Sequence, residues 1–169
     1  MDLKEKSKEL DEILITEVET WRHELKEVEA QIERLNAVLA SSEAKGDRSE
    51  NAVFQIAKDD RDMKVEKQRI LLNKLGAFND TQTEYTPTGK IKEGTTVELT
   101  LASINGIPYS GSKSRFIFKI VPHHFDSARK GLLSRESKAG LSLLNHTAGE
   151  QVEAVTNMGL VVYKIERIY

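Results

Sequence analysis

Two carboxylates three residues apart, Asp47 and Glu50, offer the clearest chemistry in the sequence. They follow Gly46 in a short stretch between two long segments without glycine or proline. Carboxylate oxygens are hard ligands that suit Mg²⁺, so the pair is suited to help hold a magnesium ion whose other ligands come from elsewhere. The same spacing is typical of a capping box, in which Asp47 caps a helix and Glu50 reaches back to a backbone N–H. Spacing alone leaves both interpretations open.

The segment before this pair predicts one long helix, from about residue 3 to residue 43. Apolar residues recur there at alternating spacings of four and three, which is typical of a coiled-coil seam. The seam comprises Leu14, Val18, Trp21, Leu25, Val28, Ile32, Leu35 and Leu39. A helix of this length is roughly 60 Å long at 1.5 Å per residue. It cannot bury its stripe against itself, so the sequence predicts a partner.

The segment after the pair predicts a second helix, which begins at about Asn51 and ends before Gly76. Its expected apolar face contains Ile56, Met63 and Ile70 at a spacing of seven, with Val53, Phe54, Ala57, Leu71 and Leu75 beside them. The break between the two segments is short, which favours an antiparallel hairpin over a continuous rod. A single bent helix that dimerises is the alternative.

The remainder of the chain predicts a small sheet. Residues 77–92 have no sustained period and are interpreted as a linker. The expected strands are residues 95–101, 114–121, 151–155 and 160–169, with a short helix over residues 137–144. The predicted fold is therefore α+β: an antiparallel coiled-coil hairpin over residues 1–76, and a small antiparallel sheet with a short helix over residues 93–169.

Composition narrows the classes of function. The chain has 169 residues, no cysteine and a formal net charge of −2, so disulfides and thiolate metal sites are excluded. No apolar run approaches the roughly 20 residues that span a membrane, and the first residues do not resemble a signal peptide, so a cytoplasmic protein is expected. Bases gather between Lys113 and Lys138, either as a solvated face or as a surface for RNA or an acidic protein. The adjacent His123 and His124 are expected in a loop or at a strand end, because no cysteine or helical histidine spacing accompanies them.

The stretch Gly46-Asp47-x-x-Glu50-Asn51-Ala52-x-Phe54 resembles the Gly-Asp-Leu-x-Glu-Asn-Ala-x-Tyr tip of the Gre transcript cleavage factors (GreA/GreB). A looser similarity extends to residues 137–146 and to Gly149-Glu150-x-Val152. The chain departs from the family pattern at five positions. These are Arg48 for leucine, Phe54 for tyrosine, and Lys138, Asn145 and His146 for proline, glycine and lysine.

The resemblance implies an FKBP-like C-terminal domain and a monomer that binds bacterial RNA polymerase. The coiled coil would enter the secondary channel, where Asp47 and Glu50 would help the polymerase to hold Mg²⁺ and to cleave the nascent RNA of a backtracked complex. The chain would have no cofactor of its own, no membrane partner and no enzymatic activity alone. Tip-shaping roles would fall to Gly46, Arg48, Asn51 and Phe54, and polymerase docking to Ser137, Lys138, Leu143 and Leu144.

Two other functions remain open. The departures at Arg48 and Phe54 leave room for a regulator that occupies the same channel without stimulating cleavage. The third hypothesis is a coiled-coil adaptor with no role at the polymerase.

Overall fold

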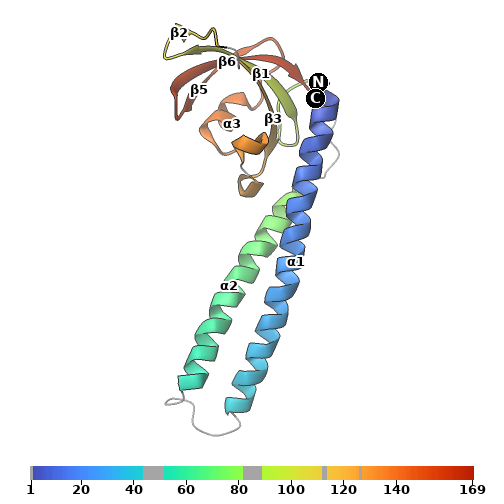
Figure 1. Cartoon of the computed structure of the whole chain (residues 1–169), viewed down its shortest axis with the longest axis vertical. Helices are drawn as coiled ribbons and strands as arrows, with labels where there is room; N and C mark the ends of the chain where they lie inside the picture. Colours follow the sequence, from blue (N-terminus) through green and yellow to red (C-terminus); the bar gives the residue numbers. More distant parts are fainter. Residues whose placement is uncertain (1, 44–51, 82–88, 112–113, 126) are drawn as a thin grey trace. The chain divides into compact units, whose positions relative to one another are not determined.

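A computed structural model describes residues 2–43, 52–81, 89–111, 114–125 and 127–169 (Figure 1). The helices are α1 (Leu3–Glu43), α2 (Ala52–Thr81) and α3 (Lys138–Leu143), with short 3-10 turns η1 (His123–Phe125) and η2 (Ala128–Lys130). The strands are β1 (Thr96–Ile104), β2 (Ile107–Pro108), β3 (Arg115–Val121), β4 (Leu132–Ser134), β5 (Gln151–Thr156) and β6 (Gly159–Ile168). The chain divides into two compact units, Thr16–Ala77 and Met1–Ile15 with Phe78–Tyr169. The α+β prediction is confirmed.

Within the unit Thr16–Ala77, α1 and α2 lie side by side and run antiparallel. Lys74 Nζ lies 4.8 Å from the ring centroid of Trp21, and Lys67 Nζ lies 2.6 Å from Glu24 Oε1. Further along α1, Leu39 shares a hollow with Phe54 near the start of α2. Contacts therefore move back along α2 as they move forward along α1. The predicted helix over residues 3–43 is confirmed, whereas the supercoil of a true coiled coil stays a prediction.

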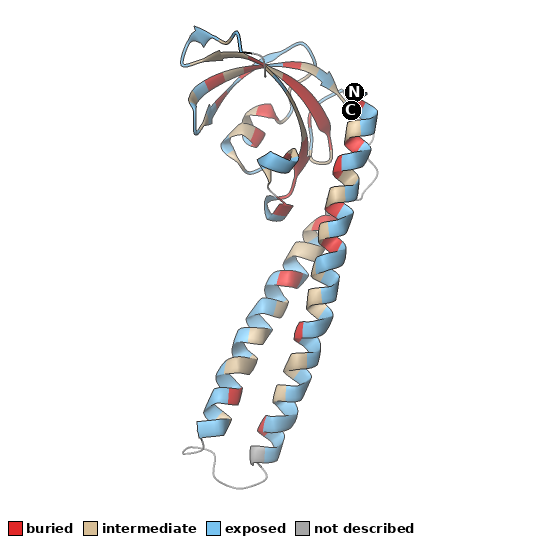
Figure 2. Cartoon of the chain, viewed as in Figure 1, coloured by how far each residue is buried: buried red, intermediate tan, exposed pale blue. Residues whose placement is uncertain are grey.

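The expected apolar face of α2 is confirmed in part, because Phe54, Ala57, Leu71 and Leu75 are buried or half-buried. Ile56, Met63 and Ile70 are exposed, at 68%, 64% and 42% of their surface. One line of buried and half-buried positions, at spacings of three and four, comprises Phe54, Ala57, Arg61, Lys64, Gln68, Leu71 and Leu75. Figure 2 shows buried and intermediate positions among exposed ones along both helices. The predicted seam through Ile56, Met63 and Ile70 is wrong, because the neighbouring line offers apolar residues at both of its ends. The centre of this neighbouring line consists of the polar residues Arg61, Lys64 and Gln68.

The helix α2 also runs past its predicted end. Gly76 lies inside the helix, where a side chain would meet open space, and α2 continues to Thr81. Phe78 provides a reason for the extension: its ring is buried and lies 5.8 Å from the ring of Phe125, centroid to centroid. The interpretation of residues 77–81 as linker is therefore wrong.

The sheet has the strand order β4-β3-β1-β6-β5, with β2 paired to β1. Its pairs are antiparallel except that of β3 with β4, which is parallel, so the sheet is mixed rather than purely antiparallel as predicted. The register of β1 against β6 shifts between Glu98 and Leu99 and again between Leu101 and Ser103. Such bulges bend a strand and increase its twist, consistent with the curled sheet in Figure 1.

The two faces of the sheet are covered by different elements. One face holds the apolar core, in which Leu99, Ile120 and Ile165 pack with Leu143 of α3. On the other face the start of α1 packs against the strands. Ser7 Oγ lies 2.9 Å from Thr96 Oγ1, Asp11 Oδ1 lies 2.6 Å from Lys119 Nζ, and Leu10 is fully buried. The first turns of α1 thus belong to the sheet unit, whereas the predicted boundaries assigned them to the hairpin.

Candidate functional site

The segment with the two candidate acids lies outside the described residues. It contains Asp47 and Glu50 together with Gly46, Arg48 and Asn51. It joins Glu43, the last residue of α1, to Ala52, the first residue of α2. The metal-binding and capping interpretations of the two acids both stay predictions.

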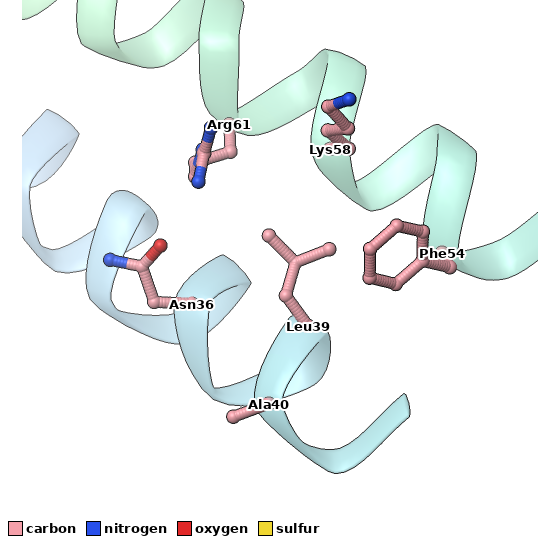
Figure 3. A pocket seen from close by; sticks show the side chains of 6 residues that line it. All are labelled: Asn36, Leu39, Ala40, Phe54, Lys58 and Arg61. Carbon is pink, nitrogen blue, oxygen red and sulfur yellow. The ribbon is translucent and has the colours of Figure 1, made fainter. Parts of the chain in front are cut away.

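The ends of α1 and α2 that flank this segment enclose a hollow of about 370 Å³ (Figure 3). Leu39 and Phe54 point toward each other across it, and Leu39 is 8% exposed. Phe54 is the third residue of α2, so the hollow lies within one turn of the start of that helix.

The wall of the hollow carries positive charge. Lys58 and Arg61 of α2 and Asn36 of α1 line it (Figure 3). Arg61 bonds the neighbouring carboxylate, with Nη2 2.6 Å from Asp62 Oδ1. The Arg61 guanidinium is thus already neutralised by Asp62, and Lys58 is the second cation of the wall.

Phe54 is thus the one predicted tip-shaping residue among those that the structure describes. It is half-buried on the α1-facing side of α2. An aromatic ring in this place needs no hydroxyl to pack against Leu39, which accounts for phenylalanine here in structural terms. The lining residues Asn36, Lys58 and Arg61 were missed, because single polar residues on two helices give no periodic signal in the sequence.

The proposed docking segment begins at Ser137, which caps α3. Its Oγ accepts a hydrogen bond from Gly140 N–H at 3.0 Å and donates to the Ser134 carbonyl at 2.8 Å. A Cβ on Gly140 would lie 1.9 Å from that same carbonyl oxygen, so only glycine fits. Lys138, the first residue of α3, is exposed. The start of α3 is therefore a tightly built surface turn with one exposed cation.

The two leucines at the end of the docking segment are buried or half-buried. Leu143 is 1% exposed and belongs to the core cluster, and Leu144 is half-buried against that cluster. Direct contact of Leu143 with a partner is excluded by this burial, so its proposed docking role needs correction. Leu143 instead holds α3 on the sheet, which positions Ser137 and Lys138.

A second turn lies close to the end of α3. Glu150 Oε2 accepts a hydrogen bond from Thr147 N–H at 2.7 Å and lies 2.8 Å from His146 Nδ1. The Thr147 backbone bond first, and the His146 bond second, lower the pKa of the Glu150 carboxyl. The residues of the loose Gly149-Glu150 similarity thus close a turn before β5.

The bases between Lys113 and Lys138 do not form one uniform surface. Arg115 and Lys119 are paired with Glu98 and Asp11, and Arg135 Nη1 lies 2.6 Å from Glu93 Oε2. Arg129 and Lys130 are exposed on η2. Three of these bases therefore form ion pairs with acids of the sheet unit.

The two adjacent histidines lie in η1 with exposed side chains, and their ring centroids are 6.0 Å apart. Among the described residues no group of three or more histidine, cysteine or acidic side chains is arranged to hold a metal ion. Within the described part of the chain, no helix is both long enough and apolar enough to cross a membrane.

No protein-family model matches the chain, and no curated protein matches it. Among solved structures, GreA factor homolog 1 of Thermus thermophilus is 18% identical, with a TM-score of 0.40, over 90% of this chain and 94% of the other. Gfh1 of Thermus aquaticus is 18% identical, with a TM-score of 0.39, over 89% and 92%. The elongation factor GreA/GreB from Nitrosomonas europaea is 17% identical, with a TM-score of 0.36, over 61% and 91%. At these identities and TM-scores the matches do not establish a family for this chain.

Proposed function

We propose that the chain is a Gre-like transcription factor. It binds bacterial RNA polymerase, inserts the α1–α2 pair into the secondary channel and stimulates the polymerase's own cleavage of backtracked RNA. The proposal is supported most by the antiparallel pairing of α1 and α2. This pairing makes the segment with Gly46-Asp47-x-x-Glu50-Asn51 the connection between the two helices. From the Trp21–Lys74 contact to Glu43, α1 extends on the order of 30 Å at 1.5 Å per residue.

The two acids suit this role by their chemistry. Asp47 and Glu50 provide only carboxylate oxygens, which fit Mg²⁺, but two side chains cannot complete its coordination. The other ligands would therefore come from the polymerase, and the chain alone would not be a nuclease. Bound magnesium supplies Lewis-acid activation of the water and the phosphate. The chain's contribution is to present two negative charges on a narrow helical support.

A regulator that occupies the channel without cleavage is the second candidate. It is favoured by Arg48, which adds a cation between the two acids where the Gre pattern has leucine. An adjacent guanidinium competes with a metal ion for carboxylate oxygens. In that case the chain binds polymerase but does not increase RNA cleavage.

The experiment that tests the proposal uses stalled, backtracked polymerase complexes. Release of 3′ RNA fragments is measured at neutral pH with magnesium, with and without the full chain. We expect the wild type to speed release and the double variant Asp47→Asn, Glu50→Gln to return it to the rate of polymerase alone. The matched control is Asp59→Asn with Asp62→Asn, which removes two exposed acids of the same spacing from α2 and should leave release unchanged.

A pull-down of polymerase separates the alternatives. Polymerase binding without fragment release supports the channel regulator and contradicts the cleavage role. Absence of polymerase binding contradicts both and leaves the coiled-coil adaptor.

A further inference from the structure

The strand β5 forms one edge of the sheet. In the order β4-β3-β1-β6-β5 it has β6 on one side, and no other described strand pairs with it. Its register with β6 runs without a shift over all six residues, which include neither glycine nor proline. Edge strands are commonly kept from pairing with other chains by proline, by a bulge or by shortness. The opposite edge strand, β4, has only three residues, whereas β5 has none of these protections.

The backbone groups of β5 point alternately toward β6 and away from it. Ile165 N–H of β6 donates to the Glu150 carbonyl at 2.9 Å, just before β5 begins. Because backbone groups alternate along an antiparallel pair, the even-numbered residues of β5 also bond to β6. The N–H and C=O groups of Gln151, Glu153 and Val155 therefore point away from β6. Within the described part of the chain, no further backbone hydrogen bond reaches these groups.

The side chains of Gln151, Glu153 and Val155 all lie on the exposed face of the sheet, whereas the two residues between them are buried. Val155 is 52% exposed and lies opposite Leu160 of β6, which is 43% exposed. A strand that pairs with β5 would place every second side chain beside these residues. The face therefore offers an apolar position at one end, an acid in the middle and an amide at the other end.

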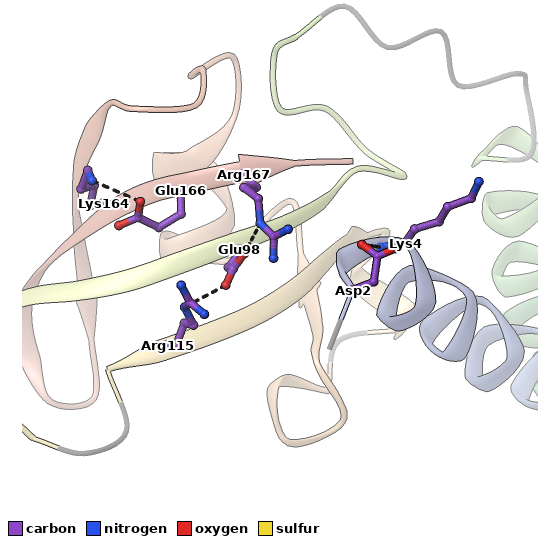
Figure 4. A network of polar contacts seen from close by, with 7 residues as sticks. All are labelled: Asp2, Lys4, Glu98, Arg115, Lys164, Glu166 and Arg167. Carbon is purple, nitrogen blue, oxygen red and sulfur yellow. Dashed lines mark hydrogen bonds and ion pairs between the residues drawn. The ribbon is translucent and has the colours of Figure 1, made fainter.

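The acid in the middle of this face is unpaired. Among the described residues, no ion pair or hydrogen bond engages the Glu153 carboxylate. Lys164 of β6 lies opposite Gln151 on the same face, but its Nζ is 3.1 Å from Glu166 Oε2 (Figure 4). Lys164 is thus engaged by Glu166, and the Glu153 charge is available to a base from another molecule.

The apolar end of this face is held in place by Asn105, which follows β1. Asn105 N–H donates to the Leu160 carbonyl at 2.7 Å, and Asn105 Oδ1 accepts a hydrogen bond from Leu160 N–H at 2.9 Å. Asn105 Nδ2 lies 3.4 Å from the carbonyl oxygen of Met158, in the turn between β5 and β6. The turn and the Val155–Leu160 pair are therefore pre-formed, which reduces the ordering cost of binding.

The charge of β5 favours a foreign segment over a second copy of the chain. Only odd-numbered residues present free backbone groups, so the centred antiparallel register of two β5 strands places Glu153 opposite the same residue of the other copy. Like charges directly opposite each other are destabilising. A shift by two residues removes this repulsion but leaves Gln151 of each copy without a partner in the strand. A nucleic acid is disfavoured for the same reason, because its phosphates would meet the Glu153 carboxylate.

We propose that an extended segment of a partner protein adds as an antiparallel strand to the open edge of β5. A base of that segment lies opposite Glu153, and an apolar residue two positions away lies opposite Val155. Main-chain bonds supply affinity in this mode, and the side chains select the sequence. Five residues of strand span about 17 Å, so the recognised segment is short. The inference is independent of the function proposed above.

The test uses the full chain and the peptide acetyl-Ile-Thr-Lys-Val-Gln-Thr-amide, whose isoleucine and lysine fall opposite Val155 and Glu153. An NMR titration of the backbone amide shifts gives the Kd. We expect Glu153→Lys to weaken binding at least about fivefold, because like charges then face each other. The matched control, Glu19→Lys, makes the same charge change at an exposed position of α1 and should change the Kd less than about twofold. Circular dichroism verifies that both variants fold.

Backbone pairing is tested with two N-methylated forms of the same peptide. Methylation at the lysine removes an N–H that faces β5 and should weaken binding at least about tenfold. Methylation at the valine alters an N–H that points away from β5 and should weaken binding clearly less. Hydrogen exchange at the Glu153 and Val155 amides should slow at least about tenfold when the unmodified peptide is bound, since edge N–H groups become hydrogen-bonded.

The proposal is overturned if the peptide does not bind, or if a peptide with glutamate in place of lysine binds equally well. Unchanged exchange at the Glu153 and Val155 amides would also overturn it. Protection of these amides that rises with the concentration of the free chain would show that a second copy covers β5 instead. Equal protection by an oligothymidylate would likewise contradict a protein segment as the occupant.

Discussion

The two units of this chain bury their side chains in different ways. In the sheet unit, apolar residues from the strands and α3 form one continuous cluster, in which Leu99, Ile120 and Ile165 are almost completely covered. In the helical unit, the middle of the α2 face that meets α1 consists of Arg61, Lys64 and Gln68. Polar residues in a helix–helix contact bury less apolar surface than apolar residues would, and they keep the helix face soluble. The comparison indicates that the sheet unit has the more continuous apolar core and carries most of the stability.

The largest effect is expected from Gly140→Ala. The new Cβ would lie 1.9 Å from the Ser134 carbonyl oxygen, and backbone must move to relieve the clash. We expect the free energy of unfolding of the sheet unit to fall by about 3 kcal/mol or more. Urea unfolding followed by NMR signals of the strands measures this change. Gly76→Ala is the matched control: it lies in helix with open space around it and should stabilise by about 0.5–1 kcal/mol.

Equal truncations in the two units should have unequal effects. Leu99→Ala removes a side chain that is 1% exposed in the core and should cost about 2–5 kcal/mol. Leu71→Ala removes one that is 3% exposed but lies beside polar seam residues, and should cost only about 1–2 kcal/mol. Trp21, the only tryptophan, reports on the helical unit by fluorescence. Equal losses in the two variants would contradict the comparison.

The position of the seam on α2 gives a sharper test of the helical unit. Lys64→Leu places an apolar side chain in the middle of the seam and should raise the free energy of unfolding of the pair by about 1 kcal/mol. Met63→Gln changes a residue that is 64% exposed, so the change should stay within about 0.5 kcal/mol. Thermal unfolding followed by Trp21 fluorescence measures both. A large loss of stability in Met63→Gln would instead support the original prediction that Ile56, Met63 and Ile70 face α1.

The smallest effect concerns the turn before β5 and depends on pH. Hydrogen bonds from Thr147 and His146 lower the pKa of Glu150 in the folded protein. A lowered pKa adds stability above the unfolded value of 4.5, and that stability is lost as the pH falls through the folded value. Glu150→Gln should therefore lower the Tm slightly at pH 7 and not at about pH 3. A Tm difference that is the same at both pH values would contradict this role.

Periodicity predicted much of the fold. The heptad pattern predicted α1, and alternation predicted β1. Strand-forming composition predicted β3, and the turn residues 157–159 predicted the β5–β6 hairpin. Periodicity did not give β4, because three residues are too short for a periodic signal. Periodicity also did not show that the first turns of α1 belong to the sheet unit and the rest of α1 to the helical unit. The same heptad pattern continues through Leu3, Leu10 and Leu14, which are buried in the sheet unit. An apolar repeat in the sequence does not show which element covers it.

The candidate site was predictable in its residue types but not in its surroundings. The expected face of α2 combined two neighbouring apolar lines, and only three-dimensional packing showed that Phe54 and Leu71 are covered while Ile56 and Ile70 are exposed. The docking segment shows the same limit, because Leu143 has the apolar character of a contact residue but is buried in the core. The roles of Asp47 and Glu50 remain a prediction from sequence.

The central claim is that Asp47 and Glu50 supply metal ligands to the polymerase, and the magnesium dependence of RNA fragment release tests it most directly. Release from backtracked complexes is measured across a magnesium titration with the wild type, Asp47→Asn and Asp59→Asn. If the acids are ligands, the wild type and Asp59→Asn should reach half-maximal release at the same magnesium concentration, and Asp47→Asn should need at least about tenfold more. Identical magnesium dependence in all three proteins would contradict the claim.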